Sequence, residues 1–166
     1  MLTVEESGSG DNFKRTPIDV DNGVAVKVGD FTGNGLQERY ATIASVGDKI
    51  GVTATPAVVK DAFTRAQADE TNFYNKAGHD AKVYEVVGDE YDPDIFGVGL
   101  HQFTAASQAN VKKGAYVVVN GSGQWVAQAA KPSSATYGFI GQVHSLHVGL
   151  YYTVVRISAL KNEAVG

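Results

Sequence analysis

The chain has no cysteine, one methionine and one tryptophan among its 166 residues. Without cysteine, neither disulfide bonds nor thiolate chemistry can contribute to its stability or activity. No apolar run approaches the roughly 20 residues that a membrane-spanning helix needs. The first residues, Met1–Glu6, also lack the basic and apolar regions of a secretory signal peptide. We therefore expect a soluble protein that is not exported.

Positive charge is scarce as well. The chain carries 14 Lys and Arg against 18 Asp and Glu, a formal net charge of −4. Binding to a phosphate backbone requires clustered Lys and Arg. The nearest approach to a basic patch is Lys112-Lys113, and two adjacent lysines are typical of a solvated turn. We expect no nucleic-acid partner.

Glycine is abundant, with 19 residues, and this suits a β protein with many turns. The strongest pattern lies in residues 110–157, where β-branched and aromatic runs alternate with turn residues. Asn120-Gly121 separates the runs 115–119 and 124–127. Asn-Gly between two such runs predicts a β-hairpin, because both central residues accept a positive φ.

Further runs of this kind predict a mainly β fold, a small β-barrel or β-sandwich with at most one or two short helices. Six short strands are expected between Ala81 and Ile157. Outside the hairpin, the predicted strands cover residues 23–28, 39–44, 49–54, 82–87, 95–100, 137–143 and 151–157.

The chain length favours one domain with an arm. Residues 1–17, which include the polar run Ser7–Asn12, are expected to form a flexible N-terminal arm. Residues 18–166 form a single β-rich domain, with N-terminal strands in 18–56 and a β-barrel core in 81–158. For the intervening residues 57–80, a short helix near 57–68 and an irregular extended excursion are equally compatible with the sequence.

Four carboxylates within six residues, Asp89, Glu90, Asp92 and Asp94, suggest a calcium loop. An EF-hand loop needs a glycine at its sixth position and a glutamate at its twelfth. Here the twelfth residue from Asp89 is Leu100, and Pro93 stiffens the run. We interpret the segment as an exposed acidic turn.

His144 and His147 have nearly the spacing of zinc ligands, but residues three apart on a strand face opposite sides. The glycine pairs do not complete a dinucleotide-binding fingerprint, and no Gly-x-Ser-x-Gly elbow is present. We therefore expect no metal, no cofactor, no catalytic residues and no enzymatic activity.

Aromatic residues on the predicted strands usually pack in the core or across strands. Tyr151 and Tyr152 are adjacent, so one of them faces outward, and an outward tyrosine can anchor an interface. The candidate interface aromatics are Tyr116, Trp125, Tyr151 and Tyr152.

Three stretches, residues 114–125, 138–143 and 152–157, are similar to the small β-rich capsid decoration (cement) proteins of tailed bacteriophages. Residues 21–26, 48–56 and 73–78 resemble structural proteins encoded beside the major capsid gene in phages of Gram-positive bacteria. The likeness covers residues 18 to 158 and implies a β-tulip-like fold. The acidic loop and the His144–His147 stretch have no counterpart in it.

The resemblance implies a structural virion protein that is made in the host cytoplasm. It would bind the outer surface of the expanded capsid and stabilise the head against internal pressure. Its partners would be the major capsid protein and itself, since members of this group bind as trimers or as monomers. We expect the N-terminal arm and one barrel face to contact the shell, and the arm's candidate capsid-binding residues are Leu2, Val4, Phe13, Pro17 and Ile18.

Two alternatives share the same strand pattern. One is another virion component, such as a tail or baseplate protein. The other is a carbohydrate-binding module in which Trp125 and either Tyr151 or Tyr152 stack on sugar rings. An enzyme ranks last.

Overall fold

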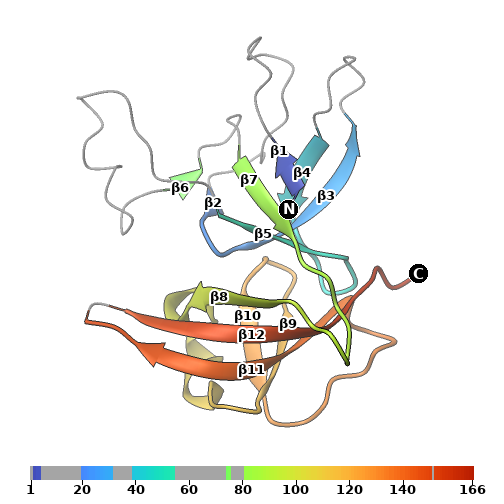
Figure 1. Ribbon diagram of the computed structural model, residues 1–166. Helices are drawn as coiled ribbons and strands as arrows, with labels where there is room; N and C mark the ends of the chain where they lie inside the picture. Colours follow the sequence, from blue (N-terminus) through green and yellow to red (C-terminus); the bar gives the residue numbers. More distant parts are fainter. Residues whose placement is uncertain (1, 5–19, 32–38, 55–73, 76–80, 151) are drawn as a thin grey trace, which may run out of the picture.

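The computed structural model describes residues 2–4, 20–31, 39–54, 74–75, 81–150 and 152–166, with the backbone alone for residues 2–4, 31 and 74. These residues form antiparallel β-sheets with two short 3-10 helices, which confirms the predicted mainly β class (Figure 1). Of the predicted excursion 57–80, residues 74–75 form strand β6 (Tyr74–Asn75), which pairs with β2 (Val20–Asp21). Its other residues lie outside the described ones.

The first sheet has five strands in the order β1-β7-β5-β3-β4. The predicted strand 82–87 belongs here, not to the barrel as expected, because β7 pairs with β1 on one side and β5 on the other. Residues 2–4, part of the predicted flexible N-terminal arm, form an edge strand in register with residues 81–83. The strands are β1 (Leu2–Val4), β7 (Ala81–Glu85), β5 (Gly51–Thr53), β3 (Ala25–Phe31) and β4 (Arg39–Ile43).

The second sheet has five strands in the order β10-β9-β11-β12-β8 and curls into a barrel. A parallel bridge between Phe103 and Trp125 joins its two ends, supported by the Thr104 N–H donating to the Trp125 carbonyl oxygen at 2.9 Å. Its elements are β8 (Ile95–Gly99), β9 (Tyr116–Val119), β10 (Trp125–Gln128), β11 (Phe139–Val148) and β12 (Thr153–Asn162), with the 3-10 helices η2 (Leu100–Gln102) and η3 (Ala105–Asn110) between β8 and β9.

A shared hydrophobic core joins the two sheets. Trp125 is fully buried, and its ring centroid lies 5.6 Å from that of Phe96 and 5.4 Å from that of Phe139. The same cluster includes Ala25 and Ile50 from the first-sheet side. Side chains from both sheets therefore pack in this core, while Val20, Val26, Ala41 and Val83 form a second buried cluster on the first-sheet side.

Asn162, at the end of β12, is a buried polar link between the sheets. Its Oδ1 accepts the Ile50 N–H at 2.8 Å, and its Nδ2 donates to the carbonyl oxygens of Ile50 at 2.8 Å and Val86 at 2.7 Å. Both the carbonyl oxygen and the NH2 group of the Asn162 side chain therefore bind backbone groups next to β5 and β7. Buried polar groups need such partners, so the C-terminal strand is tied to the first sheet at a defined position.

The predicted turn at residues 45–48 also contacts the second sheet. Asp48 accepts the Ser45 N–H at 2.8 Å, and Val46 and Gly47 accept the N–H groups of Gly138 and Val165. Asp48 pairs with Lys27 at 2.9 Å, and this hydrogen bond and charge raise the pKa of Lys27.

The hairpin predicted at Asn120-Gly121 is present, but its turn differs from the expected one. Gly123, not Asn120 or Gly121, has a positive φ, of +71°. The Asn120 N–H donates to the Gln124 carbonyl oxygen at 2.9 Å, so residues 121–123 form the loop, one residue more than in an Asn-Gly turn. The Asn120 side chain also accepts the N–H groups of Ser122 and Gln124. A three-residue loop that ends in a left-handed glycine is the alternative hairpin geometry.

Replacing Asn162 by alanine should lower the free energy of unfolding by roughly 2–4 kcal/mol, because it leaves buried backbone groups of Ile50 and Val86 without partners. Urea denaturation measures this loss. The neighbouring exposed Glu163→Ala variant is the control and should change stability by less than about 0.5 kcal/mol. Equal stability of the two variants would contradict the role assigned to Asn162.

Gly123→Ala should cost about 1–3 kcal/mol of folding stability, since alanine is strained at this φ and its Cβ would lie 2.7 Å from the Ala25 carbonyl oxygen. Gly121→Ala is the matched control, because a Cβ there meets nothing within 4 Å. Thermal melts of both variants test the turn. A larger loss for Gly121→Ala would show that the positive φ lies at Gly121, as in the predicted Asn-Gly turn.

Candidate interaction site

The structure separates the candidate interface aromatics. Trp125 is 0% exposed, so its assignment as an interface residue or a sugar-stacking platform is wrong: the ring fills the core and its Nε1 donates to the Gly23 carbonyl oxygen at 2.6 Å. Tyr116 is half-buried on β9. Tyr152 is 51% exposed, just before β12, and remains available for contact. Tyr151 lies outside the described residues.

The candidate residues of the arm are only partly described. The backbones of Leu2 and Val4 lie opposite Val83 and Ala81 in the first sheet. Phe13, Pro17 and Ile18 lie outside the described residues. The structure therefore brings the start of the chain to the edge of β7.

His144 and His147, the pair with nearly the spacing of zinc ligands, both lie exposed on β11. His144 occupies a break in register with β12 between Val143 and Ser145, and His147 lies opposite Val154. In the part of the chain that the structure describes, no three His, Asp or Glu side chains gather as a metal site.

The β7–β8 loop, residues 86–94, contains the acidic run and is the predicted exposed turn. Asp89 Oδ1 accepts the Tyr91 N–H at 2.7 Å, and Asp94 Oδ2 accepts the Val87 N–H at 2.8 Å. Backbone bonds from Asp94 to Val87 and from Asp89 to Ala159 close the loop and fasten it to β12. The carboxylates thus hold the loop in one conformation, as Asp does in tight turns.

Tyr91 lies on this loop with 96% of its surface exposed. Val87 and Ile95, which flank the point where the loop closes, are 60% and 51% exposed. A fully exposed aromatic side chain on a fixed loop is a candidate interface anchor, because its backbone is already ordered. Sequence reasoning missed Tyr91, since the four surrounding acidic residues identified the segment only as a solvated turn.

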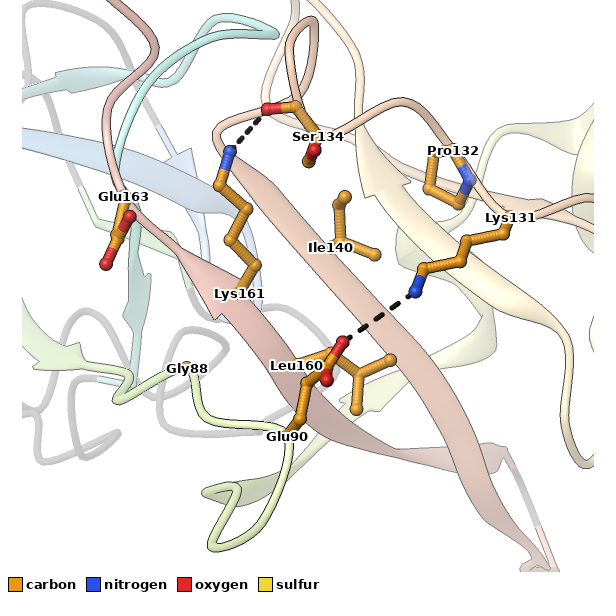
Figure 2. A pocket seen from close by; sticks show the side chains of 9 residues that line it. All are labelled: Gly88, Glu90, Lys131, Pro132, Ser134, Ile140, Leu160, Lys161 and Glu163. Carbon is orange, nitrogen blue, oxygen red and sulfur yellow. Dashed lines mark hydrogen bonds and ion pairs between the residues drawn. The ribbon is translucent and has the colours of Figure 1, made fainter.

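A shallow groove of about 340 Å³ lies beside the loop (Figure 2). Ile140 and Leu160 form its apolar part, and Figure 2 shows Lys131 reaching toward Glu90, with 3.7 Å between the charged atoms. Lys161 Nζ donates to the carbonyl oxygens of Ser134 and Tyr137, fixing the β10–β11 connection against β12.

No protein-family model, curated protein or solved structure matches this chain. None of the helices in the described residues is long and apolar enough to cross a membrane. The candidate site therefore rests on the geometry of the loop and the groove.

Addition of calcium should leave the melting temperature unchanged. Asp89 and Asp94 each already bind backbone N–H groups within the loop, and a metal would have to break those bonds. A thermal melt with and without calcium checks this, with magnesium as the control cation. A large rise specific to calcium would contradict the assignment of the loop as a structural turn.

Proposed function

We propose that this chain is a structural protein of tailed-bacteriophage heads, a capsid decoration (cement) protein that binds the outer surface of the shell and stabilises it against internal pressure. The observation that carries the proposal is Tyr91, an aromatic side chain that is almost fully exposed on a loop fixed by its own carboxylates. Such a loop binds by contact and loses little conformational entropy on binding.

The sequence resemblance supports the same function. The stretches that carry it correspond to the β9–β10 hairpin, the first half of β11 and the start of β12. These strands form the barrel from which the β7–β8 loop projects. A barrel that shares its core with a second sheet transmits load between its contact sites without rearranging.

Many identical contacts over a capsid lattice would together bind more strongly than one contact does. A decoration protein covers a lattice of identical sites, so modest contacts at each copy add up over the shell. The loop and the first residue of β8 combine an aromatic and two apolar side chains with the carboxylates of Asp89, Glu90 and Asp92. This combination fits a capsid surface with an apolar pocket bordered by basic residues.

The N-terminal strand offers a second kind of contact. Residues 2–4 pair with the edge of β7, so this segment has the capacity for β-strand addition. We propose that the arm also engages the shell, by pairing with a strand edge of the major capsid protein.

Tyr91→Ala should weaken binding to expanded empty heads by about 30-fold, the equivalent of about 2 kcal/mol for a central aromatic anchor. The heads are assembled from the major capsid protein of the phage that this proposal implies, and cosedimentation measures the bound fraction. Tyr91→Phe keeps the ring and is the matched control, expected to bind like the wild type.

Two results would contradict the proposal. The first is no binding of the wild-type protein to expanded heads at any concentration, which would exclude capsid decoration. The second is equal binding by Tyr91→Ala and Tyr91→Phe, which would retain the function but exclude this loop as the contact.

A further inference from the structure

The β11–β12 hairpin carries a second exposed apolar surface, separate from the β7–β8 loop. It extends past the end of β8, which pairs with β12 only as far as Val154 (Figure 1). The Gly149 N–H donates to the Tyr152 carbonyl oxygen at 2.9 Å and closes the turn. We call its four exposed large side chains the hairpin tip: Leu146 at 42%, Val148 at 78%, Leu150 at 88% and Tyr152 at 51% exposed.

The apolar stripe of the tip is an extension of the core. Leu146 lies directly opposite Val155, and Val148 opposite Thr153. Directly opposed residues of an antiparallel pair project to the same face of the sheet. Val155 is fully buried, so Leu146 and Val148 continue the core-facing side of the hairpin into solvent.

The outer edge of β11 is open over the same residues. β9 covers β11 at Gly141 and Gln142, and two further bonds join Val143 to Gly114 and Ala115. Beyond that point, among the residues that the structure describes, Ser145–Val148 pair with β12 alone. The N–H and C=O groups that point away from β12 therefore form an exposed strand edge, which is a template for pairing with another strand.

This edge lacks the charged side chains and proline that usually prevent pairing. Natural edge strands carry lysine, other charges or proline that block association. Residues 132–155 contain no Asp, Glu, Lys or Arg, and the edge itself, Ser-Leu-His-Val, contains no proline. The break in register at His144 limits any pairing to the four residues beyond it.

We propose that two copies of this chain associate through the edges of β11, which pair antiparallel about a two-fold axis at residues 145–148. The charge distribution selects a second copy as the occupant. Each copy has a net charge of −4, and residues 132–155 contain no Asp, Glu, Lys or Arg, so two such copies can meet at the hairpin tip without like-charge repulsion. The absence of Lys and Arg from residues 132–155, which include the hairpin tip, disfavours an anionic membrane, which attracts basic segments.

The geometry makes the pairing self-complementary. In a two-fold antiparallel pair, one residue lies opposite its own copy, and its neighbours pair reciprocally. The stripes of Leu146 and Val148 from the two copies then lie on the same face, and each covers part of the other. This inference does not rest on the proposed capsid function, since it concerns the protein alone in solution.

A cysteine scan tests the pairing directly, because the chain has no cysteine of its own. Single cysteines are introduced at positions 145, 146, 147 and 148, and at the exposed Ala135 before the start of β11 as a control. Only the residue at the axis brings its two Cα atoms within disulfide range. We expect one edge position to form a covalent dimer on mild oxidation at least tenfold faster than Ala135→Cys.

Val148→Lys is the second test, with sedimentation equilibrium as the readout. The wild type should reach twice the chain mass of 17.5 kDa with rising concentration, whereas Val148→Lys should stay at the chain mass. Ala135→Lys makes the same change of charge at an exposed site and should associate like the wild type. Because Val148 is 78% exposed, the variant should fold, and its melting temperature verifies this.

Four results would overturn the proposal. A wild type that stays at the chain mass throughout would exclude self-association. A mass of three chains would exclude a two-fold pair. A dimer that Val148→Lys leaves intact, or cysteine cross-linking at the same rate at every position, would place the contact elsewhere.

Discussion

The burial of Trp125 is the constraint on which the rest of the structure depends. The indole lies in the core that both sheets share, and its buried N–H needs an acceptor. The Gly23 carbonyl oxygen, just before β3, provides it at 2.6 Å. Because the acceptor belongs to the first-sheet side, the barrel satisfies its largest core residue only when the two sheets are docked. Asn162, at the end of β12, makes a second polar link of this kind, because its side chain binds the backbone of Ile50 and Val86 on the first-sheet side.

The two candidate contact surfaces follow from this docking. The β7–β8 loop is the connection between the sheets, so its ends are fixed on both sides, and the bond from Asp89 to Ala159 fastens it to β12. The β11–β12 hairpin leaves the same barrel beyond the last residue that β8 covers. Tyr91 and Val148 are therefore exposed on a framework that does not need to move when either side chain is covered. This framework suits the proposed function, which depends on shape and contact area.

Much of the fold could be predicted from the sequence, because strand periodicity and turn residues are local signals. The runs at 39–44, 95–100 and 115–119 became strands close to their expected bounds. Partner choice is not local, so the sequence did not reveal that residues 81–85 join the first sheet. The burial of Trp125 could not be predicted from the sequence, because aromatic residues on strands occur both in cores and at interfaces. Tyr91 was missed because its exposure depends on hydrogen bonds that Asp89 and Asp94 make in three dimensions.

Native-state hydrogen exchange in increasing urea tests most directly whether the two sheets form one rigid unit. The account predicts that the slowest amides of β3 and β7 open with the same free energy and urea dependence as those of β9 and β12, because Trp125 and Asn162 couple them. If the slowest amides of the first sheet opened at a clearly lower free energy than those of the barrel, the sheets would be separate units. The coupling would then be refuted.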